Sequence, residues 1–347
     1  MEPDGLQSDG PDQTAPGAGP RLPGRREDFW TRGWAWLHSR ANRGLLRVLL
    51  YHGVCADEHA GERWVPSHYV TRSALDAQLT ALRRAGRIID LREAVALLRC
   101  GRRWNESLFA VTFDDAPANL LTLAAPVLAA HGVTATIFAC TDRLEDGGLL
   151  EDDARQALYG PAGRRATAPG SGPIEVERID PQVRENLRCM RWDEALAMAV
   201  MGHWLGAHTR SHVRLSQADP ARRMAEIAGS VNALRRRLKT AAVPFAYPYG
   251  QSGDFGAEDL ALLRALEVPA VCTARPGANA PGGDPLCLRR TGVGLYHRST
   301  RFSLEMTGLL DARRRRQAAR GSAGRQTEDL ASTMPQTASE GRDARPA

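Results

Sequence analysis

Seven short apolar segments alternate along the chain with amphipathic helical patterns, and this alternation constrains the fold more than any other feature. Apolar runs of this kind are typical of strands buried on both faces of a parallel sheet. The predicted strands are 48–51, 88–89, 109–113, 135–139, 204–207, 243–247 and 269–272. The predicted helices are 73–85, 91–99, 119–131, 192–201, 220–238 and 257–266. Alternating strands and helices imply right-handed crossovers, so we expect an α/β fold, and seven units favour a barrel over an open sheet.

The two ends and one internal stretch interrupt this pattern. Residues 1–25 and the arginine-rich residues 312–347 have no hydrophobic periodicity, and we interpret both as disordered tails. Residues 26–311 are then expected to form one barrel domain. Within it, residues 142–190 are first acidic and then rich in Gly, Pro and Ala. A connection of that length predicts a loop insertion near the mouth of a site.

Charge and composition exclude several classes of protein. The formal net charge is +6, but nearly all the positive charge is arginine in short runs without interleaved aromatic residues, so we expect no nucleic-acid binding. Weak attraction to an anionic membrane surface stays open. No apolar run is long enough for a transmembrane helix or a secretory signal, which predicts a cytoplasmic protein. The six cysteines have no paired spacing and are expected to be reduced and mostly buried.

Two carboxylates and two imidazoles follow separate predicted strands. Asp114 and Asp115 come after 109–113, and His208 and His212 come after 204–207. Alone, the aspartates could be a solvated turn that caps the next helix, and the histidines could be polar surface. Together, at the carboxyl ends of parallel strands, they predict one site. One Asp and two His can hold a divalent metal with positions left for water and substrate, which points to metal-assisted hydrolysis.

Three motifs, in this order, are similar to those of a known family. They are Thr-Phe-Asp-Asp at 112–115, His-Thr-Arg-Ser-His at 208–212 and Phe-Ala-Tyr-Pro-Tyr-Gly at 245–250. They resemble the successive motifs of polysaccharide deacetylases, also called the NodB-homology domain or carbohydrate esterase family four. The resemblance extends over residues 44–300. It implies a distorted (β/α)7 barrel of the NodB type.

The resemblance also implies how the charged residues divide their roles. Asp115, His208 and His212 would bind the metal, and Asp114 would be the general base that takes a proton from the attacking water. Zinc suits two imidazoles and one carboxylate, although cobalt or nickel would also be accepted.

Further residues complete the implied site. The backbone N–H of Tyr249 would stabilise the oxyanion of the tetrahedral intermediate, unless this segment is simply a proline turn that ends a strand. His52 is similar to the acid histidine of the branch that acts on poly-N-acetylglucosamine, so we expect it to protonate the leaving amine. A core histidine bonded to a carbonyl is the simpler alternative for His52, and His297 is an alternative acid. Arg290 resembles an arginine beside the catalytic aspartate, where it would hold Asp114 ionised.

Two positions depart from the family pattern. Ala116 follows the aspartates where the family usually has glycine, so the loop beyond the base is expected to differ. Ala246 stands where many members carry an arginine. Both departures bear on how active the site is.

These features predict a metal-dependent hydrolase that removes an acetyl group from an N-acetylated amino sugar. The substrate would be an oligosaccharide, a polysaccharide or a glycolipid precursor. One alternative is hydrolysis of another acyl group or of a non-sugar amide, as in a deformylase. A second alternative is an inactive homologue that only binds carbohydrate. The motifs describe amide hydrolysis and identify neither the sugar nor the oligomeric state.

Overall fold

The computed structural model describes residues 42–160, 174–297 and 299–308. The expected tails, 1–25 and 312–347, lie outside these residues. Within the described ranges, no helix is both long and apolar enough to cross a membrane. The six cysteines are free thiols and four of them are buried, as expected from their spacing.

Seven parallel strands form the central ring. Their order is β10 (Arg290–Gly292), β1 (Leu46–Tyr51), β5 (Leu108–Phe113), β6 (Thr136–Ala139), β7 (Trp204–Ala207), β8 (Phe245–Ala246) and β9 (Val271–Cys272). The ring closes where Cys272 of β9 pairs in parallel with Leu288, just before β10. The predicted distorted (β/α)7 barrel is therefore confirmed.

One predicted strand stands outside the ring, and an unpredicted strand takes its place. β4 (Arg87–Ile88) pairs with the first two residues of β5, whereas β6 pairs with the last two. These two strands therefore lie beside different halves of β5, and β4 does not continue the ring. β10 closes the ring instead, beside β1. Its residues, Arg-Thr-Gly, have no apolar pattern, which is why the sequence did not predict a strand there.

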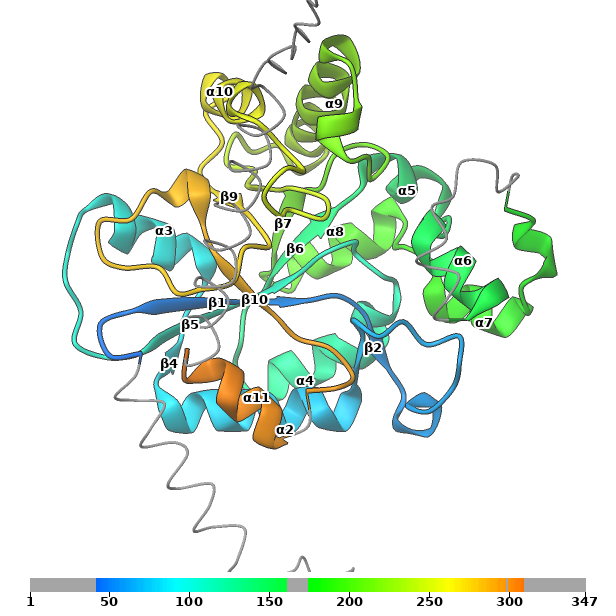
Figure 1. Ribbon diagram of the computed structural model, residues 1–347, viewed down its shortest axis with the longest axis horizontal. Helices are drawn as coiled ribbons and strands as arrows, with labels where there is room; N and C mark the ends of the chain where they lie inside the picture. Colours follow the sequence, from blue (N-terminus) through cyan, green and yellow to red (C-terminus); the bar gives the residue numbers. More distant parts are fainter. Residues whose placement is uncertain (1–41, 161–173, 298, 309–347) are drawn as a thin grey trace, which may run out of the picture.

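The six predicted helices are all present, with small shifts at their ends. They are α2 (Arg72–Ala85), α3 (Leu91–Arg99), α4 (Ala125–Ala130), α8 (Trp192–Val200), α9 (Pro220–Leu238) and α10 (Ala257–Ala265). One π-helical turn, Leu120–Ala124, precedes α4. Figure 1 shows α2 and α4 on one side of the strands and α9 and α10 on the opposite side. Among the described residues, further helices are α5 (Thr141–Asp146), α6 (Glu151–Tyr159), α7 (Pro181–Leu187) and α11 (Ser299–Met306).

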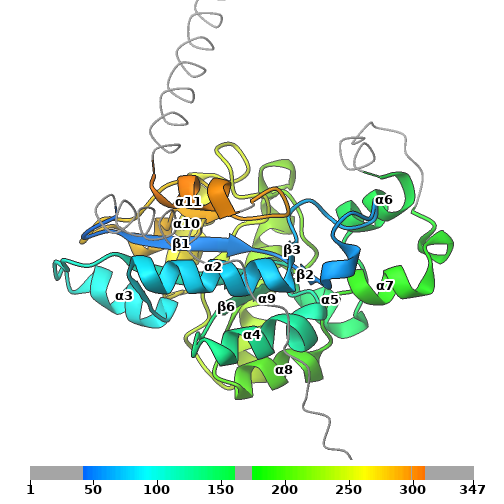
Figure 2. The ribbon, with the colours of Figure 1, turned by 90° about the horizontal axis from the view of Figure 1, so that it is seen from below.

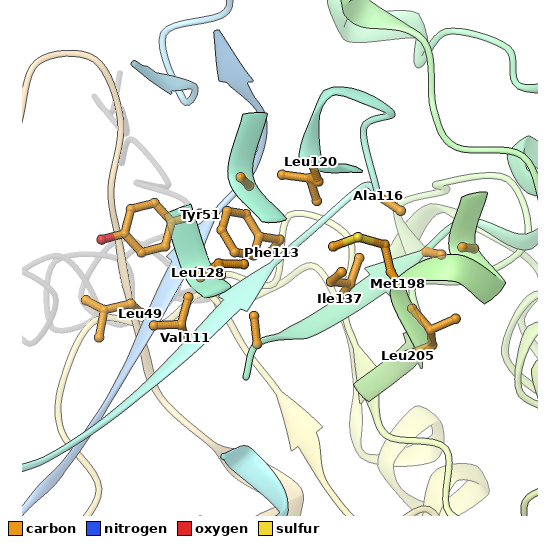
Figure 3. Close-up of a cluster of buried hydrophobic side chains, with 14 of the residues drawn as sticks. Leu49, Tyr51, Val111, Phe113, Ala116, Leu120, Leu128, Ile137, Met198 and Leu205 are labelled. Atoms are coloured by element: carbon orange, nitrogen blue, oxygen red, sulfur yellow. The ribbon is translucent and has the colours of Figure 1, made fainter. Parts of the chain in front are cut away.

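Alternate residues of each strand belong to two packed layers. Tyr51, Phe113, Ile137 and Leu205 extend from neighbouring strands toward the helices, where they meet side chains such as Met198 (Figure 3). The other layer lies inside the ring and contains Leu46, Val48, Leu108, Ala110, Phe138, Ala246, Cys272 and Leu288. Because side chains along a strand alternate, the inner row of β5 continues through Thr112 to the residue after the strand. That residue is Asp114.

The expected insertion lies beyond the carboxyl ends of the strands. α6 and α7 belong to it, and in both views they stand past the tip of the β1 arrow (Figures 1 and 2). On the same side, β2 (Val54–Cys55) and β3 (Val70–Thr71) form a separate two-stranded parallel sheet. The insertion and the segment that contains β2 and β3 therefore both lie at the end of the barrel where Asp114 lies.

Candidate active site

Asp114 is held by an arginine from the strand that closes the ring. Its two oxygens accept hydrogen bonds from the Arg290 guanidinium, at 2.6 Å from Nη1 to Oδ1 and 2.7 Å from Nη2 to Oδ2. Arg290 is fully buried, and its Nε also donates to the Thr273 carbonyl. Burial opposes ionisation of Asp114, but the charge of Arg290 outweighs it and lowers the pKa of the carboxyl. This pairing is the one that the resemblance implied.

Asp115 points toward two imidazoles. Its Oδ1 lies 3.4 Å from Nε2 of His208 and 3.3 Å from Nε2 of His212. This oxygen is buried and accepts no hydrogen bond of ordinary geometry from the described residues. A buried carboxylate oxygen of this kind is costly unless another group satisfies it. One ligand atom from each residue lies within 4.8 Å of the others, so a single cation can reach all three.

The protonation of His208 fits a metal ligand. Its Nδ1 lies 2.8 Å from the Ala246 carbonyl, which can only accept, so Nδ1 carries the proton and Nε2 keeps its lone pair. Burial lowers the pKa of this imidazole to about 4, so it is neutral near pH 7. Ala246, where the family arginine is missing, thus orients a proposed ligand through its backbone. The donor set of Asp115, His208 and His212 fits a divalent ion such as zinc.

The site motifs contain unusual backbone conformations. Asp115, Ala116, Thr209, His212 and Tyr249 have φ values of 70°, 47°, 62°, 62° and 60°. Elsewhere in the described chain, only Lys239 and Glu267 among non-glycine residues have positive φ. Non-glycine residues in this region are strained, and such strain gathers where function requires an exact side-chain direction. The value at Ala116 also explains why glycine suits that position.

Substitutions at Ala116 should report this strain. Ala116→Gly relieves a left-handed cost of about 1–2 kcal/mol but loses a buried methyl worth roughly 0.8 kcal/mol, so little net change in stability is expected. Ala116→Val places a β-branched side chain at the same φ and should destabilise the protein by about 1–3 kcal/mol. Urea unfolding of both variants measures the difference. Equal stability of the two would mean that Ala116 is not constrained by its backbone.

His52 lies on the opposite side of Asp115 and has a partner that the sequence did not reveal. Its Nε2 is 3.9 Å from Oδ2 of Asp115. The ring of His68 meets the His52 ring edge-on, with 4.4 Å between centroids. His68 in turn lies 3.7 Å from Asp153 of α6, measured from Nε2 to Oδ1. His52 therefore faces the site as expected. Through His68 it is also connected to Asp153, which belongs to the insertion.

Tyr249 lies on the rim, next to the metal-ligand candidates. Its ring centroid is 5.1 Å from that of His212, and the Arg214 guanidinium lies 4.0 Å above the ring. Its hydroxyl donates to Oδ2 of Asp152, at 3.3 Å. Among the described residues, its backbone N–H donates no hydrogen bond, which leaves it available to a ligand. A groove of about 1570 Å³ begins at His212 and Tyr249 and extends along α6.

Other residues are placed differently from the expected set. His297, the alternative acid, hydrogen-bonds to Gly294 and faces Glu305 at 3.8 Å, and it does not join the Asp115 cluster. His68, Asp152 and Asp153 were not predicted. A lone histidine carries no motif, and a pair of aspartates in an acidic stretch reads as a solvated helix start. Only their nearness to the site in the fold distinguishes them.

Comparisons with known proteins agree with this geometry. Residues 102–270 match the family model described as polysaccharide deacetylase. The chain therefore contains a polysaccharide deacetylase domain. Members of this carbohydrate esterase family act on the amide C–N bonds of N-acetyl groups, so the chain is a hydrolase of that class. No curated protein sequence matches it significantly.

Solved structures show the same fold. IcaB from Ammonifex degensii has a TM-score of 0.57 at 22% identity, covering 76% of this chain and 97% of that one. The deacetylase PplD from Streptococcus pyogenes, in complex with acetate, has a TM-score of 0.56 at 18% identity, covering 76% and 99%. A de-N-acetylase from Aggregatibacter actinomycetemcomitans has a TM-score of 0.56 at 16% identity, covering 75% and 99%. At these identities the likeness shows the polysaccharide deacetylase fold.

Proposed function

We propose that this polysaccharide deacetylase is metal-dependent and removes the acetyl group from an N-acetylated amino sugar within an oligosaccharide or a glycolipid precursor. The observation that carries the proposal is the separation of the two aspartates. Asp114 is fixed by Arg290, whereas Asp115 faces two imidazoles. Asp114 would then act as a base through the lone pairs that Arg290 leaves unused, while Asp115 would bind a cation, as the family motifs imply.

The ion would be held by Asp115, His208 and His212, and we propose zinc because imidazole nitrogens suit it. When bound, such an ion supplies Lewis-acid chemistry, making water more acidic and polarising the amide carbonyl. His208 is presented with its Nε2 lone pair toward the site because its Nδ1 is bonded to Ala246. Removal of the ion by a chelator should abolish acetate release, and zinc should restore it.

The chain's own residues would move the protons. Asp114 takes a proton from the water whose oxygen attacks the carbonyl carbon, and Arg290 keeps this base ionised. The backbone N–H of Tyr249 donates to the oxyanion of the tetrahedral intermediate. As the C–N bond breaks, His52 gives a proton to the leaving nitrogen. The products are acetate and a protonated amine: both protons of the attacking water end on the nitrogen, His52 regains the proton that it gave and Asp114 passes on the proton that it took, so atoms and charges balance.

The groove beside Tyr249 supports an extended substrate. Its volume of about 1570 Å³ exceeds the roughly 300–1,000 Å³ of sites for drug-sized ligands. The lining residues include Arg143, Glu151 and Ser216, which offer both donors and acceptors to sugar hydroxyls. The Tyr249 ring adds an apolar face beside the proposed ion.

Acetate release from defined substrates tests the proposal. Oligomers of N-acetylglucosamine should be hydrolysed with a higher kcat/KM than the single sugar, because only the longer substrate fills the groove. The matching N-formyl oligomer separates acetyl from formyl specificity. If the zinc-loaded protein hydrolyses neither series and no lipid-linked amino sugar, the proposed activity is wrong. Preference for the formyl series would correct the acyl group and leave the amide chemistry in place.

Tyr249→Phe distinguishes the backbone of this residue from its side chain. If the N–H stabilises the oxyanion, the variant should keep its kcat, because phenylalanine retains that N–H. Loss of the hydroxyl contact with Asp152 removes one exposed hydrogen bond, worth about 0.5–1.5 kcal/mol, and that loss should be seen in stability or KM. Steady-state kinetics with an oligomeric substrate checks this. A drop in kcat of two orders of magnitude or more would assign catalysis to the phenol.

A further inference from the structure

The Asp115 carboxylate lies between two pairs of imidazoles. Its Oδ1 faces His208 and His212, while its Oδ2 is 3.9 Å from Nε2 of His52. His52, His68 and Asp115 each offer a ligand atom within 4.8 Å of the others, as the first set does. A carboxylate with one oxygen toward each imidazole pair has the arrangement of a bridging ligand. The second set has no assigned role as a cation site in the proposed reaction.

The fold brings the second pair of imidazoles together through local contacts. His52 follows β1, and His68 stands shortly before β3. The strands β2 and β3 that flank them pair through Val54 and Val70. Gly53 lies so close to the Tyr69 ring that a Cβ on it would be 2.2 Å from the nearest ring atom. The glycine next to one histidine therefore packs on the tyrosine next to the other, which keeps the two imidazoles near each other.

A buried carboxylate stands behind His68. Oδ1 of Asp153 lies 3.7 Å from Nε2 of His68, and the Asp153 side chain is only 5% exposed. This distance is longer than a hydrogen bond, so the carboxylate acts on His68 through its charge. The second set thus has a buried negative charge behind its outer histidine, which favours a cation there.

We propose that His52, His68 and Oδ2 of Asp115 form a second, weaker site for a divalent cation that prefers imidazole, such as zinc. A cation bound at this second site inhibits the enzyme. An imidazole nitrogen that binds a cation has no proton to give, so His52 cannot then protonate the leaving amine. The inference rests on the proposed function, since it shares Asp115 and the acid role of His52. It makes free zinc both activator and inhibitor.

Burial and charge explain why the second site is the weaker one. The side chains of His52 and His68 are 23% and 16% exposed, compared with 2% and 15% for His208 and His212, so the first set contains one fully buried imidazole and the second set none. Exposed ligands lose more freedom when they bind an ion. Two cations on one carboxylate also repel each other, so the second ion enters at a higher zinc concentration than the first. Magnesium and calcium, which prefer oxygen ligands, should not fill the second site.

Equilibrium dialysis of the full chain against buffered free zinc tests the proposal, with bound metal measured by mass spectrometry. We expect two zinc ions per chain, bound in separate steps, and acetate release that rises with the first and falls with the second. His68→Gln should bind one zinc ion only, and its rate of acetate release should stay at its maximum as the zinc concentration rises further. Asp153→Asn should weaken the second step by about 10- to 100-fold. His131→Gln, which changes a histidine paired with Asp76 elsewhere, is the matched control and should bind two.

The possible outcomes separate this inference from the proposed function. One zinc ion per chain at every concentration overturns the second site and leaves the first. Two ions in both the parent protein and His68→Gln also overturn it. No bound zinc overturns the metal dependence itself. If the variants fail to fold, Co²⁺ titration of the unmodified protein followed by electron paramagnetic resonance decides. A signal per ion that weakens as the second ion binds indicates that the two ions share Asp115. Two independent signals contradict a shared ligand.

Discussion

Asp114→Asn and Asp115→Asn are expected to lose activity for different reasons. Asp114→Asn should lower kcat by about 10²–10⁴-fold, the usual effect of losing a general base, while the protein still binds its first metal ion. Asp115→Asn should lose that ion along with the activity, because an amide oxygen is a poorer ligand than the charged oxygen between His208 and His212. Metal content and kcat, measured on the same preparations, separate the two variants.

Folding of both variants has to be measured as well. Asn at position 114 keeps the shape of Asp114, but it has one acceptor oxygen for Arg290 in place of two and leaves the buried guanidinium without its counter-charge, so some loss of stability is expected. Circular dichroism and urea unfolding establish how much of each variant is folded at the assay temperature. If Asp114→Asn loses the metal and Asp115→Asn keeps it, the division of roles between the aspartates is reversed.

Arg290→Met should be the most destabilising single change near the site. Arg290 is fully buried, and two of its hydrogen bonds go to Asp114. Removing one partner of a buried ion pair leaves the other charge unpaired and costs about 3–5 kcal/mol. The double variant Asp114→Asn, Arg290→Met removes both charges and should be more stable than the sum of the single effects predicts. Urea unfolding at pH 7 measures all three free energies.

The pH dependence of Arg290→Met has a definite sign. In the parent protein the pKa of Asp114 is lowered, so its contribution to stability is present above the unfolded pKa of about 4 and is lost as pH falls through the folded value. Without Arg290, burial is no longer offset by the guanidinium charge, and the pKa of Asp114 rises. The deficit of the variant should therefore be largest near neutral pH and shrink in acid, and its activity should fall at a higher pH than that of the parent protein. If the activity of Arg290→Met falls at the same acidic pH as that of the parent protein, Arg290 does not control the pKa of Asp114.

Much of the barrel could be predicted from the sequence because most of its strands are apolar on both faces. Strands such as β5 and β7 are continuous hydrophobic runs, and the six helices between strands have clear amphipathic patterns. β10 could not be predicted, because its Arg290 enters the interior only by pairing with Asp114, which is 176 positions away in the sequence. β4 was assigned to the ring because an apolar pair does not show which half of its neighbour it will join.

The sequence by itself determined the alternating architecture, the order of the motifs and the residue types of the candidate metal and base positions. These depend on local periodicity and on residues a few positions apart. The family resemblance implied that Arg290 lies beside Asp114, and the structure shows the two hydrogen bonds between them. Only the tertiary structure decided that Asp115 faces imidazoles on both sides, and that His68 and Asp153 stand behind His52. Those contacts join distant segments, and their strength comes from burial, which raises the cost of every unpaired charge. Burial is a property of the folded chain and not of any single stretch of its sequence.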